Sequence, residues 1–215
     1  ESVRPFVDGQ PVEEYGLDPY AAKVEEAQAL LAEAGYPNGE GFPEISFLYN
    51  TSENHKKTAE AVQQMWEQNL GIKVSLHNED WAVFQDTRRE GNYTIARGGW
   101  LGDYNDPMTM LALYTSYSGN NDLQWRWQEY KGAPWDKVLN PTSKVFDEAI
   151  QNAFITTGTE RDEWIKKAED TMMENMVIMP IYFYSYHDII DLSVVEGAHR
   201  TPLGHWTFKD AKLVQ

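Results

Sequence analysis

The sequence contains no cysteine, and this absence excludes disulfide bonds, thiol catalysis and zinc sites built on cysteine. Basic residues are also scarce, since 18 lysine and arginine residues stand against 34 aspartate and glutamate residues, for a formal net charge of −16. A chain with this charge repels nucleic acid and anionic membrane surfaces, so we expect no nucleic-acid partner. No apolar run approaches the roughly 18 residues that a membrane span requires.

Motifs of catalysis and metal binding are missing as well. The five histidines show no ligand spacing, and no phosphate-binding loop, dinucleotide-binding fingerprint or nucleophile elbow is present. We therefore predict no metal and no cofactor. The chain opens at Glu1 with neither an initiator methionine nor a signal peptide, which suggests a processed protein or an excised fragment.

What is present indicates a folded protein of one domain or two small ones. The chain has 215 residues, of which 41% are hydrophobic and 13% aromatic. In its first half, apolar periodicity and closing glycines predict helices over 18–35, 54–71 and 81–91. Alternating patterns predict strands over 43–50, 72–78 and 93–99. Alternation of strands and helices predicts an α/β fold with an at least partly parallel sheet.

The ends of several elements carry recognisable signals. Asp18 is predicted to cap the first helix, with Pro19 at its first position. In the second half, helices are predicted over 107–114, 142–154 and 159–176, the last capped by Thr159. One or two strands are predicted over 177–195, and the final residues show no convincing pattern.

The tryptophan-rich stretch 122–140 is interpreted as a packed surface loop in preference to a ligand-facing insertion.

The segment 98–107, GGWLGDYNDP, follows the third predicted strand, where ligands of open α/β sheets bind. Glycines let another backbone approach closely, and the Asp103 carboxylate among them can hold an ammonium group. Trp100 offers an apolar wall, while Arg97 and Arg88 can hold a carboxylate. These groups suggest a zwitterionic ligand such as a peptide, although a solvated loop with a buried tryptophan explains the same residues.

Two other kinds of site compete for this segment. Asp103 and Asp106 could form the acid and base of a carbohydrate-active enzyme. However, Asp106 followed by Pro107 is typical of a helix start, which favours a structural role for the second acid. A calcium loop is disfavoured, because a proline occupies the fifth position and no glycine or distant glutamate follows in register.

The residues around the segment resemble the oligopeptide-binding proteins of bacterial ABC transporters, in the extracellular solute-binding protein family 5. The resemblance covers most of residues 18–195 and rests on HKKTAEAVQQMWEQNLGIKVSLHNEDWAVFQDTRREGNYTIARGGWLGDYNDP, on EAGYPNGEGFPEISFLYNTS before it, and on SGNND and KAEDTMMENMVIMPIYFYSYHD after it. It implies the C-terminal lobe of a type II periplasmic-binding-protein-like fold, with a mixed sheet flanked by helices. Residues 1–195 would form the ligand-binding lobe, and residues 196–215 a tail that packs on the missing lobe.

The family captures extended peptides between two lobes that close by hinge motion, and the peptide hydrogen-bonds through its backbone like an added strand. The resemblance assigns the peptide ammonium to Asp103, and the carboxylate to Arg97 and Arg88 for short peptides or to His55 for a longer one. It places main-chain contacts at Gly99 and Leu101, and pocket walls at Trp100, Trp81, Asn50 and Tyr184.

The implied protein is not an enzyme. It would be a monomeric receptor with an oligopeptide ligand and membrane permease subunits as partners, outside the cytoplasm, either periplasmic or held at the cell surface as a lipoprotein. The family's chains are much longer, so we expect this chain to fold alone but to bind peptide weakly. A receptor of the same superfamily for a dipeptide, sugar, metal chelate or haem is the first alternative; a purely structural or partner-binding domain is another.

Overall fold

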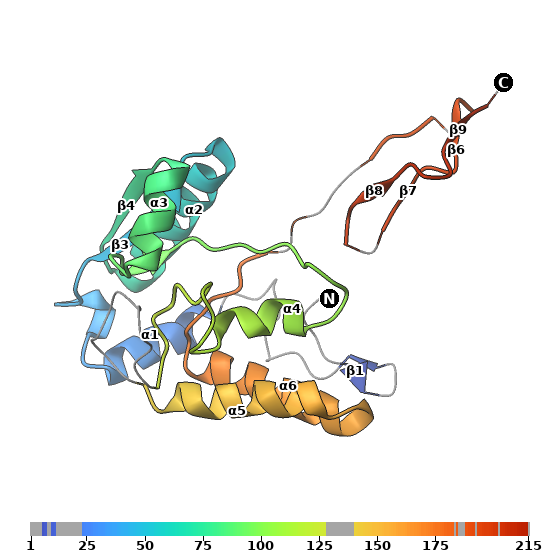
Figure 1. Ribbon diagram of the computed structural model, residues 1–215. Helices are drawn as coiled ribbons and strands as arrows, with labels where there is room; N and C mark the ends of the chain where they lie inside the picture. The colour runs from blue at the N-terminus through green and yellow to red at the C-terminus, as the bar shows by residue number, and fades with distance from the viewer. Residues whose placement is uncertain are drawn as a thin grey trace. The chain divides into compact units, whose positions relative to one another are not determined.

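The computed structural model describes residues 6–7, 10–11, 23–127, 140–182, 184, 188–191, 193–201 and 203–214 (Figure 1). The chain divides into two compact units. Unit 1 comprises residues 1–12, 100–118 and 140–215, and unit 2 comprises residues 13–99 and 119–139. The predicted cap at Asp18 and Pro19, and most of the tryptophan-rich stretch, lie outside the described residues.

Unit 2 contains a three-stranded parallel sheet with β3 (Ile45–Asn50) at its centre. The neighbouring strands are β4 (Val74–Glu79) and β5 (Ile95–Ala96), and Phe47 pairs with Leu76 on one side and with Ile95 on the other. The predicted strands and their parallel arrangement are thus confirmed, although β5 is shorter than the predicted 93–99. Because the strands are parallel, their carboxyl ends meet at one edge of the sheet.

Helices connect these strands as the sequence predicts. They are α1 (Val24–Glu33), α2 (Glu53–Leu70) between β3 and β4, and α3 (Trp81–Arg89) between β4 and β5, with the short 3₁₀ turn η1 (Pro37–Gly39) before β3. The Asp80 carboxylate caps α3 by accepting hydrogen bonds from the backbone of Ala82 at 3.0 Å and Val83 at 3.3 Å.

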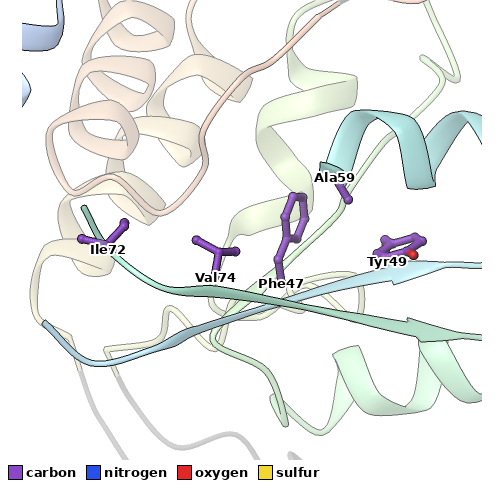
Figure 2. Close-up of a cluster of buried hydrophobic side chains, with 5 residues drawn as sticks. All are labelled: Phe47, Tyr49, Ala59, Ile72 and Val74. Carbon is purple, nitrogen blue, oxygen red and sulfur yellow. The ribbon is translucent and has the colours of Figure 1, made fainter. Parts of the chain in front are cut away.

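The core of unit 2 forms on one face of the sheet. Its buried members are Phe47, Tyr49, Ala59, Ile72 and Val74. Figure 2 shows the four strand-side residues on one side of the two strands, with Ala59 of α2 facing them. Side chains alternate along a strand, so Leu48 and Asn50 point to the opposite face. Helix α3 lies against β3 and contributes no residue to this cluster, which places α2 and α3 on opposite faces.

Two glycines allow the turn after α2 to touch the turn before β3. Gly71 ends α2 with a φ of 69°, and Gly39 has a φ of 77°. A Cβ on Gly39 would lie 2.6 Å from the backbone carbonyl group of Gly71. Only residues without a side chain permit this backbone-to-backbone approach, and it fixes where α2 ends relative to the start of the sheet.

Unit 1 is built on the helical hairpin of α5 (Thr142–Ile155) and α6 (Gly158–Glu174), which lie side by side in Figure 1. Its other helical pieces are α4 (Met108–Leu111) and η2 (Ala112–Tyr114), so all three predicted helices are confirmed. The predicted cap at Thr159 is wrong, because Thr157 precedes α6. Gly158 adopts a φ of 61°, and this left-handed turn lets the helix begin before Thr159.

The prediction of strands over 177–195 is also wrong for the described residues there, except that β6 (Val195–Glu196) begins at its last position. A strand needs partners for its backbone groups, and no described residue pairs with residues 177–182 or 188–191. Their apolar side chains remain exposed, including Met179, Ile181 and Ile189. The described residues from 177 to 191 therefore belong to no strand.

The remaining strands are pairs of two residues each. In unit 1, β6 pairs with β9 (Lys212–Leu213), and β7 (His199–Arg200) pairs with β8 (Trp206–Thr207), both antiparallel. Near the N-terminus, β1 (Phe6–Val7) pairs with β2 (Gln10–Pro11). The sequence analysis predicted none of these pairs. No helix in the described part of the chain is long and apolar enough to cross a membrane.

A buried carboxylate ties the loop after η2 to α5. Asp147 accepts a hydrogen bond from the backbone N–H of Ser116 at 2.9 Å and a second, short one from the Ser116 hydroxyl. Both residues are almost fully buried. A buried charge is tolerated where donors of this kind satisfy it, so the pair fixes the loop on the helix.

We expect Gly71→Ala to destabilise unit 2, because the new methyl group would combine a left-handed φ with a clash against the Asn38 carbonyl. The loss should be about 2–4 kcal/mol in urea denaturation. Gly41→Ala is the matched control, since Gly41 also has a positive φ but open space around its Cα. Its loss should be about 1 kcal/mol. Equal losses for the two variants would contradict the proposed close approach.

Asp147→Ala should lower the free energy of unfolding by about 2–4 kcal/mol, because two buried donors on Ser116 lose their acceptor. The neighbouring Glu148→Ala provides the control, because Glu148 is exposed and its carboxylate lies 3.7 Å from Nζ of Lys144 in an exposed ion pair. This second change should cost less than about 0.5 kcal/mol. Thermal or urea denaturation of both variants measures the difference. A loss in free energy of unfolding as small for Asp147→Ala as for Glu148→Ala would show that the buried pair contributes little.

Candidate functional site

Three of the predicted site residues of unit 2 meet at the carboxyl edge of its sheet. Asn50 is the last residue of β3 and is only 7% exposed. Its backbone oxygen lies 3.4 Å from Nδ1 of His55 in the first turn of α2, and its Oδ1 lies 3.5 Å from Nη1 of Arg97. Arg97 directly follows β5, and its backbone N–H donates to the Leu48 carbonyl at 2.8 Å. The parallel pairing of β3 and β5 therefore brings these side chains together.

This edge favours a neutral histidine beside a permanent positive charge. Burial lowers the pKa of His55, the nearby charge of Arg97 lowers it further, and the Asn50 carbonyl acts in the opposite direction. The imidazole is consequently uncharged near neutral pH, and Arg97 supplies the cation. Such a pair can receive an anionic group, with the histidine gaining a proton when the anion arrives.

Arg88 of α3 already has a carboxylate partner. Its Nη2 lies 2.7 Å from Oδ2 of Asp122, and its guanidinium group lies over the Phe84 ring at 5.2 Å from the centroid. Sequence reasoning missed Asp122, because 34 residues separate the partners and no local pattern connects them. Burial raises the pKa of Asp122, while the charges of Arg88, Arg89 and Arg126 oppose that rise.

Gly99 and Trp81 are the other predicted site residues of unit 2. Trp81 begins α3 with its ring exposed, 5.9 Å from the Phe84 ring. A Cβ on Gly99 would lie 2.8 Å from Nη2 of Arg97, so this glycine leaves room for the guanidinium group. Gly98 has open space around it. The close approach that the sequence analysis expected from a ligand backbone at Gly99 is occupied here by a side chain of the protein itself.

The remaining predicted residues belong to unit 1, and Asp103 is the central one. Its backbone N–H donates to Oγ1 of the buried Thr109 at 2.8 Å, which fixes the turn before α4. Its carboxylate is exposed and has no hydrogen-bond or ion-pair partner among the described residues. The side chains of Trp100, Leu101 and Tyr184 are exposed too. Among the described residues, the Asp103 carboxylate is thus an unpaired anion, and the other side chains offer exposed apolar surface. A ligand that bears an ammonium group can use both.

Asp106, three residues further on, is used by the fold. Its Oδ1 accepts a hydrogen bond from the backbone N–H of Met108 at 2.9 Å, so Asp106 stabilises the start of α4, although the cap position itself falls on Pro107, one residue later than predicted. Nη2 of Arg161 in α6 lies 2.7 Å from Oδ1 and 2.8 Å from Oδ2 of the same carboxylate. The Asp106 carboxylate is therefore engaged by both a backbone N–H and the Arg161 guanidinium group. This engagement disfavours a role for Asp106 as the acid–base partner of Asp103. Arg161 and Thr109, which hold the two ends of this turn, gave no recognisable signal in the sequence.

Tyr104, between the two acids, lies in a negative environment. Burial raises the pKa of its hydroxyl, and the charges of Asp106 and Asp103 raise it further, while Arg161 counteracts them. This environment favours a cation over an anion. Across the described residues, no group of three or more histidine, aspartate or glutamate side chains is arranged to hold a metal ion.

Known proteins share this sequence and fold. The periplasmic oligopeptide-binding protein OppA of Salmonella typhimurium is 37% identical over 191 residues, which are 89% of this chain and 32% of that protein. The oligopeptide-binding protein OppA of Bacillus subtilis is 40% identical over 156 residues, 72% of this chain and 26% of that protein. This chain thus spans a third or less of the length of these two relatives.

The fold comparison agrees. The crystal structure of Haemophilus influenzae OppA in complex with RPPGFSPFR matches with a TM-score of 0.61 and 36% identity, over 75% of this chain and 29% of that chain. The expected type II periplasmic-binding-protein fold is confirmed by such neighbours. The sequence profile of the bacterial extracellular solute-binding proteins, family 5 Middle, matches residues 4–122. With more than half of its length matched in this way, the chain belongs to family 5 of the bacterial extracellular solute-binding proteins.

Proposed function

We propose that this chain is part of the substrate-binding component of an ABC importer, which captures extended oligopeptides between two lobes and delivers them to membrane permease subunits. The observation that carries the proposal is the contrast between two acids of one turn. Asp106 is paired with Arg161, whereas Asp103 presents an exposed carboxylate without a partner among the described residues. An unpaired carboxylate on a fixed turn can anchor the α-ammonium group of a peptide.

The other roles follow the chemistry of each side chain. Arg97, His55 and Arg88 receive the peptide carboxylate, in combinations that depend on peptide length. The exposed rings of Trp100, Trp81 and Tyr184, with Asn50, line side-chain pockets. Main-chain groups at Gly99 and Leu101 hydrogen-bond the peptide backbone, as in strand addition. Wide pockets with main-chain recognition suit a receptor that accepts many peptide sequences.

The proposal extends to the whole receptor. Residues 1–195 serve as the ligand-binding lobe, and residues 196–215 pack on the remainder of the full-length protein. The receptor works outside the cytoplasm as a monomer, either periplasmic or lipid-anchored at the cell surface, and it catalyses no reaction. Mass spectrometry of ligands that co-purify with the full-length receptor tests the class: peptides of a narrow length range support it, and a sugar, haem or metal chelate overturns it.

Asp103→Asn in the full-length receptor should weaken the binding of a free-amine peptide by roughly 2–5 kcal/mol, or about 30- to 4,000-fold, because the bound ammonium loses its counter-charge. Isothermal titration calorimetry measures the loss. An N-acetylated peptide should bind the wild type poorly, and the substitution should change its affinity little. The two peptides and the two proteins together form a double-mutant cycle. Asp170→Asn, which removes an equal charge from α6, is the control. An equal loss of affinity for both peptides would contradict the assignment of Asp103 to the peptide ammonium group.

Binding of a peptide whose carboxylate reaches His55 should take up protons. The free protein holds the His55 pKa below 6.5, and a carboxylate beside the ring raises it, so the complex binds more protons between the two values. Affinity should therefore increase as pH falls from about 7.5 to about 6. Calorimetry at about pH 6 in buffers of different ionisation enthalpy counts the protons. His55→Gln and C-terminal amide peptides should abolish the uptake; unchanged uptake with either one contradicts the assignment.

A further inference from the structure

The Arg88–Asp122 pair has the properties of a filled anion site. The two side chains are only 19% and 18% exposed, and their closest nitrogen and oxygen atoms lie 2.7 Å apart. The guanidinium group is fixed on its other side by the Phe84 ring, which is fully buried. Tyr93 donates its hydroxyl proton to the backbone oxygen of Asp122 at 2.6 Å, so the loop that carries this acid is also held in place.

Three arginines act electrostatically on Asp122. Arg88, Arg89 and Arg126 all lie close enough to favour the ionised carboxylate electrostatically. Of the three, Arg88 is the one whose guanidinium group pairs directly with the Asp122 carboxylate. Without that carboxylate, Arg88 would attract an external anion.

We propose that Asp122 is a specificity-determining residue, an internal carboxylate that competes with the ligand's C-terminal carboxylate for Arg88. The proposal rests on the peptide-binding function proposed above. A ligand carboxylate that takes the same N–H groups of Arg88 must displace Asp122, and a partly buried carboxylate then loses its counter-charge. Peptides whose carboxylate would fall at Arg88 are therefore penalised. Asp122 thereby shifts the preferred peptide length.

The tethered carboxylate has an advantage in this competition. Its loop is already ordered by the Tyr93 hydrogen bond, so forming the pair with Arg88 requires little further loss of conformational freedom. A free peptide must be immobilised before its carboxylate can reach the same guanidinium group. The Tyr93 bond uses the backbone of residue 122, so an uncharged side chain at this position leaves it intact.

The test uses Asp122→Asn in the full-length receptor, with alanine peptides of two to five residues as free acids and as C-terminal amides. For at least one length, the free acid should bind the variant about 10- to 150-fold more tightly than it binds the wild type, the range of one charge-assisted hydrogen bond. The amide of that length should show no gain. Adding Arg88→Gln to the variant should remove the gain, because the freed guanidinium group is then missing.

A matched control separates this competition from a general charge effect. Asp86→Asn also removes one negative charge beside an arginine, since Asp86 pairs with the neighbouring Arg89 at 3.4 Å, but this pair is exposed. Asp86→Asn should leave the affinity for both the free acids and the amides unchanged. A gain shared by the amides, or by Asp86→Asn, overturns the proposal, as does an unchanged affinity of Asp122→Asn for every free acid.

Folding of each variant is verified by thermal melting, with Asp122→Ser as the substitute for the asparagine variant. If neither uncharged variant folds, Asp122 is structural and the proposal is overturned. The proposed function stands or falls separately, because it requires only that the wild-type receptor bind peptides. Peptide binding by the wild type without a gain in the variants rejects the role of Asp122 alone.

Discussion

Parallel pairing of β3 with a strand on each side is the interaction on which unit 2 depends. It leaves β3 covered on both faces, with Phe47 and Tyr49 in the core shared with α2 and Leu48 on the face of α3. It also brings the ends of β3 and β5 to one edge. Asn50, His55 and Arg97 meet there because the hydrogen-bonded register of the two strands holds their backbones. The polar edge is thus a product of the apolar sheet beneath it.

Local signals sufficed for the elements of this sheet. Alternation in 43–50 and 72–78, the apolar stripe of α2 and the glycine at position 71 predict β3, β4 and α2 within one or two residues, whereas β5 is shorter than the predicted 93–99. Interactions between distant residues were beyond such reasoning. Strands over 177–195 were predicted from side-chain type alone, but a strand exists only where another strand pairs with it. The two-residue pairs near the C-terminus are too short to produce a pattern.

In the candidate site, too, local interactions could be predicted from the sequence and contacts between distant residues could not. Asp106 followed by Pro107 predicted the start of α4 to within one residue, because a cap is a local interaction. The ion pairs of Arg161 with Asp106 and of Arg88 with Asp122 join residues separated by 55 and 34 positions, so only the fold reveals them. These contacts decide which charged groups remain available. Residue type identified the candidates for ligand binding. Tertiary pairing then distinguishes Arg88, which is engaged by Asp122, from Asp103, whose carboxylate has no partner in the part of the chain that the structure describes.

The described residues between α6 and β6 have a practical consequence. Met179, Ile181 and Ile189 project apolar side chains into solvent along a stretch of backbone that no described strand pairs with. Unpaired backbone flanked by apolar side chains is a template for edge-to-edge association between molecules. Preparations of these 215 residues would therefore need low concentration and rapid handling to stay monodisperse. Charged substitutions at Ile181 and Ile189 are the first changes to make when soluble material is required.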